Sequence, residues 1–400
     1  MGTYSNDPAA IVGVGHTEYS MNSGRTVPSM AVEACSKAMQ DAELGVDDVD
    51  GVLCFNAEEA VAGLGYSAVS AESVATSLAL KEVNYSCEWY SGGTAPSVLV
   101  ELAELLVRSG KCKAVLVFRS MNGRSGSRLG GSGWDNMAFG MWQHRMPYGY
   151  LTYPQTMAMW CRRHMVEYGT TAEQLGSVAI NQRSNAIHNE RAMHRKPVTM
   201  DDYLSSRMIC DPLRLYDMCL ETDGACALLV SSSDRALDCP KQPVYIKASA
   251  WVGSKEVGSD WADFFLRNDM TENFTVSLGK KLYKQAGLTP KDIDVAEIYD
   301  CFTHTVLMGL EGLGFCKKGE GGPFAASGAI ALDGEIPVNT NGGMLSEGYI
   351  HGMNVIAEAV SQLRGDGGRT QVANAKNAIV TSGAWTEGGG LILSNEKGGQ

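Results

Sequence analysis

Hydrophobic and polar positions along this chain follow a pattern that occurs twice. Residues 34–54 read as an amphipathic helix followed by a β-branched strand, and residues 282–298 repeat this order at a constant offset of 244. Further matched segments follow in the same order in both halves, namely helix 98–108 with strand 114–118, and helix 354–363 with strand 377–381. The pattern predicts two related α/β halves.

The short, continuously apolar strands are typical of sheets that helices cover on both faces. Between the halves, the chain is rich in Gly, Arg, Met and aromatic residues and then shows helical patterns at 153–168 and 172–189. We interpret this part as an inserted loop domain that carries binding function. The predicted domains are an N-terminal half, the loop domain and a C-terminal half, at residues 1–119 with 212–240, 120–211 and 241–400.

Composition narrows the possible partners. The longest apolar runs are far shorter than the ~20 residues that span a bilayer, and the N-terminus has no signal-peptide pattern, so we expect a cytoplasmic protein. A net charge of −12 argues against nucleic acid or an anionic membrane as the main partner. Residues 119–214 are locally basic, with 12 Lys and Arg against 7 Asp and Glu. This excess suits a polyanionic ligand such as a CoA diphosphate, and a solvated basic face is the equal alternative.

Cysteine and histidine spacing predicts no metal site and no disulfide framework, and we expect no cofactor in this chain. The 11 cysteines are scattered singly, without a CxxC pair or a Cys/His cluster at zinc spacing. The histidines that we expect to be structural or on the surface are His16, His144, His164, His188 and His194.

Several motifs resemble the thiolase superfamily, specifically its lipid-transfer-protein (sterol carrier protein X) branch. The matching stretches, in family order, are Ala10-Ile-Val-Gly-Val-Gly-His, Cys210-Asp-Pro-Leu-Arg, Asp223-Gly-Ala-Cys-Ala, Glu297-Ile-Tyr-Asp-Cys-Phe, Asn339-Thr-Asn-Gly-Gly, Gly348-Tyr-Ile-His-Gly and Glu387-Gly-Gly-Gly-Leu-Ile-Leu. The resemblance implies an α/β thiolase fold. In that fold two duplicated halves pack in a five-layer αβαβα sandwich with an inserted loop domain, and the protein is expected by analogy to be a homodimer.

The catalytic positions of that branch are changed here. In the family, a Cys-x-x-Gly-(Ser/Gly)-x-Ala turn supplies the cysteine that takes the acyl group, and in this chain the register puts Trp89 at that position. The family motifs His-Asp-Cys-Phe and Gly-His-Pro-x-Gly supply two imidazoles, and these positions are Tyr299 and Tyr349. Replacement of both histidines by tyrosine within intact motifs indicates a different reaction in a retained pocket.

This pattern resembles the steroid side-chain-cleaving aldolases of bacterial cholesterol and bile-acid degradation. That resemblance implies retro-aldol cleavage of a β-hydroxyacyl-CoA, here a 17-hydroxy-steroid with a three-carbon CoA thioester side chain, to a 17-ketosteroid and propionyl-CoA. It also implies a small zinc-ribbon and OB-fold partner protein in an α2β2 complex, with zinc only in that partner.

Retro-aldol cleavage needs a base for the β-hydroxyl proton, stabilisation of the departing thioester enolate, and an acid for its α-carbon. We assign Tyr349 as the base and Tyr299 as the proton donor or enolate-stabilising hydrogen bond, and exchanged roles are the alternative. A phenol with an ordinary pKa of about 10 is a poor base at neutral pH, so one tyrosine needs neighbours that favour phenolate. The candidate neighbours are His304 and His351.

Backbone N–H groups complete the predicted site. By analogy with the family, those near Trp89 and Tyr90 and at Gly388 and Gly389 hold the enolate oxygen. A tight turn before strand 391–394 explains the glycines equally well. The Met- and aromatic-rich stretch 134–160 is interpreted as a wall against a polycyclic acyl group, with core packing or a dimer interface as equal alternatives.

Two other functions remain open at this point. The first is an ordinary 3-oxoacyl-CoA thiolase that uses Cys87 as a displaced nucleophile. If that stretch is extended, the Cys87 side chain shares a face with residue 89. The second is a non-catalytic acyl-CoA-binding subunit that scaffolds a partner enzyme.

Overall fold

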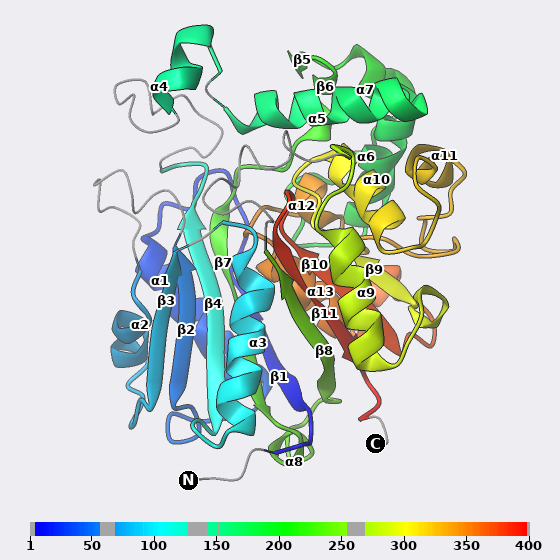
Figure 1. The fold of residues 1–400 in the computed structure, drawn as a ribbon. Helices are drawn as coiled ribbons and strands as arrows, with labels where there is room; N and C mark the ends of the chain where they lie inside the picture. Colours follow the sequence, from blue (N-terminus) through cyan, green and yellow to red (C-terminus); the bar gives the residue numbers. More distant parts are fainter. Residues whose placement is uncertain are drawn as a thin grey trace.

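The computed structural model contains a nine-stranded mixed sheet composed of two half-sheets joined edge to edge (Figure 1). It describes residues 5–56, 69–90, 92–126, 142–150, 152–253 and 269–397, and of Tyr90, Trp142 and Arg145 only the backbone. The strand order is β3-β2-β4-β7-β1-β8-β11-β10-β9. The N-terminal half-sheet contains β1 (Ala9–His16), β2 (Gly51–Asn56), β3 (Tyr85–Tyr90), β4 (Ala114–Asn122) and β7 (Asp223–Ser232). The C-terminal half-sheet contains β8 (Val244–Val252), β9 (Val295–Glu297), β10 (Asn377–Ser382) and β11 (Gly388–Ser394).

Two helices lie between the half-sheets, which meet at a short antiparallel pairing of β1 with β8. Helices α3 (Ala95–Arg108) and α13 (Met353–Arg364) each contact strands of both half-sheets and form a central layer. The outer faces are covered by α1 (Val27–Asp41) and α2 (Ala71–Ser77) on the N-terminal half, and by α9 (Thr275–Ala286), with α10 (Thr303–Gly312) packed on it, on the C-terminal half. The predicted α/β thiolase fold with five layers is confirmed.

The internal duplication is present in the fold. With the offset of 244 residues, Gly51 at the start of β2 corresponds to Val295 at the start of β9. In chain order, α1 corresponds to α9, α3 to α13, and β4 to β10. Val338 forms a parallel bridge with Ala296 of β9, in the place that β3 takes beside β2.

Close contact between β1 and α1 explains the Val-Gly-Val-Gly sequence of the first strand. A Cβ atom at Gly13 would lie 2.0 Å from the carbonyl oxygen of Ala38, and one at Gly15 would lie 2.0 Å from that of Ala34. Any side chain at either position would therefore push the helix off the strand, and the outer layer of the N-terminal half depends on these two glycines.

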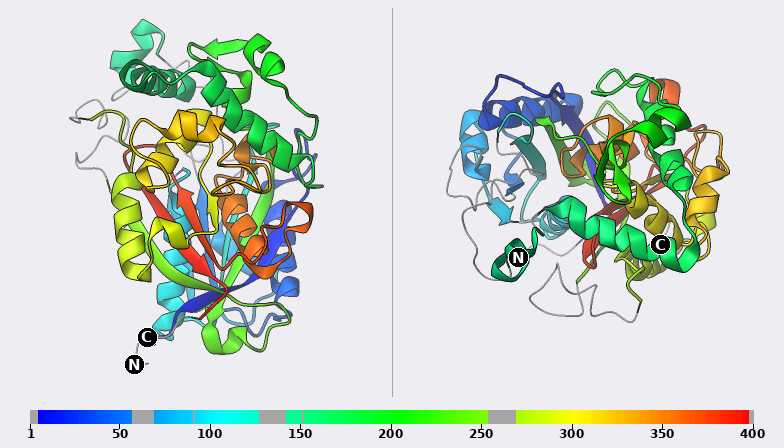
Figure 2. Two further views of the ribbon diagram at one scale, coloured as in Figure 1. Left: turned by 90° about the vertical axis from the view of Figure 1, so that its right-hand side faces the viewer. Right: turned by 90° about the horizontal axis from the view of Figure 1, so that it is seen from above.

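The segment between β4 and β7 lies over one end of the half-sheets (Figures 1 and 2). The two predicted helices are α5 (Tyr153–Tyr168) and α6 (Ala172–Ala186), of which the second ends earlier than expected. The predicted boundary at residue 119 falls inside β4, and the division into domains remains a proposal. The shorter elements of the chain are α4 (Trp142–Arg145), α7 (Met200–Ser205), β5 (Met208–Cys210), β6 (Leu213–Arg214), α8 (Ser233–Ala236), α11 (Gly321–Ala326) and α12 (Gly343–Ser346). Among the described residues, no helix is long and apolar enough to cross a membrane.

Candidate active site

Tyr299 and Tyr349 come from different segments of the C-terminal half and meet at their hydroxyl groups. Tyr299 follows β9, and Tyr349 lies in the loop between α12 and α13. Their hydroxyl oxygens are 2.9 Å apart, a hydrogen-bond distance, and their rings meet edge to face with centroids 6.4 Å apart. Tyr299 is buried and Tyr349 is partly buried. The structure therefore brings the two predicted phenols together.

Tyr299 lies against the starts of both central helices. A Cβ atom at Gly93, just before α3, would lie 2.0 Å from the Tyr299 hydroxyl oxygen. A Cβ atom at Gly352, the N-cap of α13, would lie 3.0 Å from the Tyr299 ring. A helix start presents unpaired N–H groups and partial positive charge. Both helices therefore favour negative charge near the Tyr299 hydroxyl.

The backbone of each tyrosine is tied to a neighbouring strand. The Tyr299 N–H donates to Thr381 Oγ1 of β10 at 2.9 Å. The Tyr349 N–H donates to Thr222 Oγ1 at 2.8 Å, immediately before β7. The two anchors belong to the C-terminal and N-terminal half-sheets, so the hydroxyl contact depends on how the halves pack together.

Asp300, next to Tyr299, fixes the start of the loop that carries Tyr349. It is fully buried and accepts hydrogen bonds from the N–H groups of Met344 and Leu345 at 2.8 and 3.2 Å. Burial raises the pKa of Asp300 to about 7. Gly343 is required here, because its φ is 59° and a Cβ atom would lie 2.1 Å from Asp300 Oδ2.

His351 lies beside Tyr349 and contacts a buried cation. The rings of His351 and Tyr349 have centroids 4.7 Å apart. Arg119 of β4, which is 1% exposed, donates from Nε to His351 Nδ1 at 3.2 Å. Because Nδ1 accepts this hydrogen bond, the neutral imidazole carries its proton on Nε2. His351 is thus the predicted neighbour that contacts the tyrosine pair.

Burial raises the pKa of both tyrosines well above the ordinary value of 10.0. The thiols of Cys301 and Cys219 lie close enough to raise both pKa values further. Burial therefore works against ionisation of either phenol, and either hydroxyl can be the donor in the hydrogen bond between them.

His304 lies in an aromatic cluster and has no hydrogen bond to the tyrosine pair among the described contacts. Its ring centroid is 5.9 Å from that of Phe302 and 6.1 Å from that of Trp160, and Trp160 stacks on Trp385. Burial lowers the pKa of His304 to about 3, so the imidazole is neutral. It supplies no positive charge to a phenolate.

The residues predicted around the lost nucleophile lie on β3. Trp89 pairs with Phe55 of β2, and its side chain is 41% exposed. Cys87 pairs with Leu53 and packs, partly buried, against the main core. Tyr90 ends the strand, and its side chain lies outside the described residues.

Gly388 and Gly389 begin β11, so they are strand residues and not part of the predicted turn. Both pair with β8, and Gly389 also pairs with Ser382 of β10. The turn lies earlier, at Gly383, where φ is 118°. A Cβ atom at Gly383 would lie 3.1 Å from Thr94 Cγ2. The turn therefore packs on the start of α3, next to Gly93.

The predicted aromatic wall is only partly within the described residues, because residues 127–141 and 151 lie outside them. Tyr148 is 87% exposed, whereas Trp160 is fully buried. The Tyr153 and Trp385 ring centroids are 6.1 Å apart. The described part of the wall thus joins α5 to the turn that packs on α3.

The described residues contain no group of three or more His, Cys, Asp or Glu that could hold a metal ion. His16 Nδ1 lies 2.7 Å from the Tyr19 hydroxyl oxygen, and His164 Nε2 lies 3.1 Å from Glu311 Oε1. Both histidines are thus held by protein side chains.

Arg119, Thr222 and Thr381 contribute to the site and were not predicted. A charged residue directly after the apolar strand 114–118 was a usable signal for Arg119, because buried charges are rare and need a partner. The two threonines carry no such signal, since their contacts span 127 and 82 residues of sequence.

Comparison with known proteins finds relatives that match nearly the whole chain. Residues 258–395 match the "Thiolase C-terminal domain-like" family. The steroid side-chain-cleaving aldolase of Thermomonospora curvata is 39% identical over 97% of this chain and 98% of that protein. The 17-hydroxy-3-oxo-4-pregnene-20-carboxyl-CoA lyase of Mycobacterium tuberculosis is 38% identical over 96% of this chain and 98% of that protein.

The chain is a member of the thiolase superfamily. Among solved structures, the Ltp2-ChsH2(DUF35) aldolase superposes with a TM-score of 0.89 at 38% identity, and the match covers 98% of this chain and 99% of that one. The resemblance predicted from the motifs is confirmed. In this member of the superfamily, the hydroxyl groups of two tyrosines form a hydrogen bond near the starts of the two central helices.

Proposed function

We propose that this chain is a carbon-carbon lyase that cleaves a β-hydroxyacyl-CoA by a retro-aldol reaction. The observation that carries the proposal is the hydrogen-bonded pair of Tyr299 and Tyr349 at the starts of α3 and α13. The proposed substrate is a 17-hydroxy-steroid with a three-carbon CoA thioester side chain, and the products are a 17-ketosteroid and propionyl-CoA. The names of the two long relatives support this choice.

Tyr299 is the base in this proposal, which exchanges the roles assigned from the sequence. The Tyr299 phenolate takes the proton of the tertiary alcohol, the carbon-carbon bond breaks to form the ketone, and its electron pair moves into the thioester enolate. Tyr349 then gives its proton to the enolate α-carbon. The two helix starts favour the phenolate, each by about 0.3–2 kcal/mol, and thereby offset part of the cost of burying it.

The enolate oxygen is placed at the start of α3. The chain leaves β3 there at Tyr90, and the turn before Gly388 packs on Thr94 from the other side. N–H groups at a helix start have no partner within the helix and can stabilise an oxyanion. The predicted donors near Trp89, Tyr90, Gly388 and Gly389 border this position.

The proposed assembly follows the solved relative. That structure is named as a complex of Ltp2 with ChsH2(DUF35). We propose that a small zinc-ribbon and OB-fold protein binds this chain in an α2β2 complex. The chain itself is proposed to be a cytoplasmic homodimer that needs no cofactor of its own.

Product analysis tests the reaction. The purified chain, with and without its partner, is incubated with 17-hydroxy-3-oxopregnene-20-carboxyl-CoA, and separately with a 3-oxoacyl-CoA plus free CoA. Release of the 17-ketosteroid and propionyl-CoA in equal amounts is expected from the first substrate. CoA-dependent cleavage of the second substrate alone would identify a thiolase, and binding without turnover of either would identify a scaffold.

A further inference from the structure

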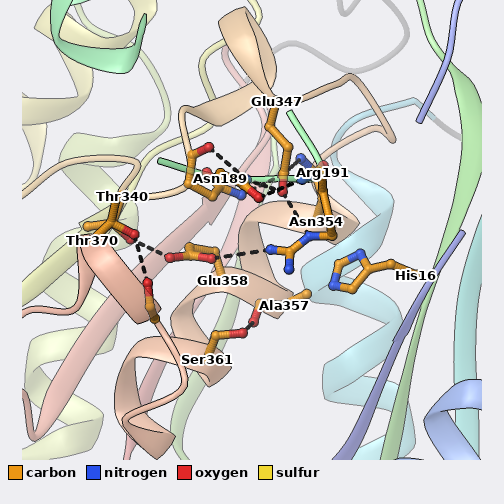
Figure 3. Close-up of polar contacts among 12 residues, drawn as sticks. His16, Asn189, Arg191, Thr340, Glu347, Asn354, Ala357, Glu358, Ser361 and Thr370 are labelled. Atoms are coloured by element: carbon orange, nitrogen blue, oxygen red, sulfur yellow. Dashed lines mark hydrogen bonds and ion pairs between the residues drawn. The ribbon is translucent and has the colours of Figure 1, made fainter. Parts of the chain in front are cut away.

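A buried carboxylate two residues before Tyr349 joins two distant parts of the chain (Figure 3). Glu347 Oε1 accepts from Asn189 Nδ2 at 2.8 Å and from Arg191 Nε at 3.3 Å. Glu347 Oε2 accepts from Asn341 Nδ2 at 2.6 Å and from Asn354 Nδ2 at 2.7 Å. The first two donors follow α6 in the inserted segment, and the other two belong to the C-terminal half.

The backbone around Glu347 is held by the same two regions. The N–H of Met193 donates to the Glu347 carbonyl at 3.0 Å, and the N–H of His194 donates to that of Ser346 at 3.1 Å. Asn354 also donates to the Gly348 carbonyl at 3.0 Å. The chain is therefore fixed on both sides of Glu347, up to the residue before Tyr349.

Arg191 forms an ion pair with Glu347, and it lies between two carboxylates in Figure 3. Its Nη2 is 3.8 Å from Glu358 Oε2. The Glu347 side chain is 0% exposed, and a buried carboxylate that loses its cation is strongly destabilised. The other titratable groups around this ion pair are Glu358 on α13, Tyr19 after β1, Cys226 on β7 and His16 on β1. The first three cannot carry positive charge, and burial, with the nearby Arg191, lowers the pKa of His16 well below 6.5, so its imidazole is neutral.

We propose that Arg191 is a positioning residue for the reaction: acting through Glu347, it holds the Tyr349 hydroxyl at hydrogen-bond distance from that of Tyr299. The inference rests on the proposed function. Without Arg191, Glu347 keeps three neutral donors and loses its cation. The carboxylate then takes up a proton or moves toward water, and either change releases the loop that carries Tyr349.

The test compares Arg191→Met with Arg235→Met. Arg235 is the control, because its side chain is about as exposed as that of Arg191, 33% against 39%, while its partner Asp48 is 37% exposed and lies on the N-terminal half. We expect Arg191→Met to lower kcat about 10- to 100-fold with KM within about threefold, since small misplacements of catalytic groups have effects of this order. Arg191→Lys should restore much of kcat. Arg235→Met should match the wild type.

A pH profile separates positioning from a general loss of stability. Burial raises the pKa of Glu347 and Arg191 lowers it, so removing Arg191 raises it further. The kcat of Arg191→Met, divided by that of the wild type at the same pH, should therefore fall as the pH falls. Wild-type kcat and pH dependence in a folded Arg191→Met protein would overturn the proposal, as would a loss confined to KM.

Two further measurements cover the remaining outcomes. If Arg191→Met does not fold, Asn189→Ala provides a second test. It removes one neutral donor to Glu347, together with the hydrogen bonds of Asn189 to the Asn341 carbonyl and from the Arg191 N–H. We expect kcat to fall severalfold, and unchanged kcat there also overturns the proposal. Amide hydrogen exchange of residues 341–351 needs no substrate and should be faster in the Arg191 variant than in the Arg235 variant. Faster exchange in a protein whose wild type cleaves no β-hydroxyacyl-CoA would refute the proposed reaction while leaving the Arg191 contact supported.

Discussion

The two central helices begin at the same place in the molecule, but their first turns have different surroundings. Helix α3 follows a glycine turn, and Gly93 leaves room there for the Tyr299 hydroxyl. Helix α13 follows a segment that contains Tyr349 and His351 and is held by buried carboxylates. In a fold made by duplication, the proposed catalytic side chains are therefore concentrated in the C-terminal half. The N-terminal half contributes space and a helix start.

The same difference appears in the sheet. With the offset of 244, Glu297 at the end of β9 corresponds to Leu53 in β2. Leu53 is a core residue, whereas Glu297 contacts Thr340, which also contacts Glu358 of α13. At this position the C-terminal half buries an ionisable group where its counterpart buries an apolar one. Such groups are costly to bury, and here they hold the loop that leads to Tyr349.

Removing either phenol should have the largest effect. We expect Tyr299→Phe and Tyr349→Phe each to lower kcat about 10²- to 10⁴-fold, the range of general acid-base catalysis. Because burial raises the pKa of both tyrosines, wild-type kcat should rise with pH as the phenolate forms.

Single-turnover assays of ketone and propionyl-CoA release assign the roles of the two tyrosines. Tyr349→Phe should still release ketone slowly if Tyr299 is the base, while proton delivery to the enolate fails. Equal loss of both steps in Tyr349→Phe, with ketone release preserved in Tyr299→Phe, would reverse the assignment. Wild-type rates in both variants would remove the tyrosine mechanism altogether.

Adding one methyl group at the start of α3 tests what the N-terminal half contributes. A Cβ atom at Gly93 would meet the Tyr299 hydroxyl oxygen at 2.0 Å, whereas nothing lies within 4 Å of one at Gly92. We expect Gly93→Ala to lower kcat about 10- to 100-fold by displacing Tyr299, and Gly92→Ala to have little effect. Steady-state kinetics with melting temperatures of both variants provide the measurement. Similar kcat values for the two variants would mean that the absence of a side chain at Gly93 is not needed to position the Tyr299 hydroxyl.

The sequence predicted the fold and the tyrosine pair because both depend on local signals. The duplication is visible in helix and strand periodicity, and Tyr299 and Tyr349 stand at defined places in short motifs. The partners that hold them are not visible in this way. Thr222 lies 127 residues from Tyr349 in sequence, and only packing of the two halves brings them together.

The misplaced glycines have a similar cause. Gly388 and Gly389 read as a turn because glycine has weak strand propensity. In the structure, tertiary contacts override that propensity: a Cβ atom at Gly388 would lie 2.4 Å from the Phe274 ring. The strand accepts glycine there because a larger residue does not fit.

A smaller effect is expected from the buried acid of β9. The Thr340 hydroxyl lies 2.9 Å from Glu297 Oε1 and 2.7 Å from Glu358 Oε1, but it has only one hydrogen to donate. One carboxyl must therefore be protonated. Burial, together with the Glu358 carboxylate, raises the pKa of Glu297 well above 4.5, so Glu297 holds the proton.

This assignment sets the pH dependence of stability. Above the unfolded pKa of Glu297, the native state binds more protons than the unfolded state, so stability falls as the pH rises, by at most about 1.4 kcal/mol per pH unit for one proton. Glu297→Gln should remove that loss. The free energy of unfolding of the variant, relative to that of the wild type, should therefore be higher at pH 9 than at pH 6. Urea titrations at both pH values measure the difference, and a constant difference would argue against a protonated Glu297.

The smallest effect is expected from Cys87, and it decides whether the N-terminal half retains a nucleophile. Cys87 lies on β3, two residues before Trp89, and packs partly buried against the core. A retro-aldol cleavage forms no acyl-enzyme, so Cys87→Ser should leave kcat close to that of the wild type. The matched control is Cys239→Ser, another partly buried thiol of the N-terminal half that lies outside β3. Loss of cleavage and of covalent acyl labelling in the Cys87 variant, but not in the control, would place the nucleophile on β3 and return the reaction to the N-terminal half.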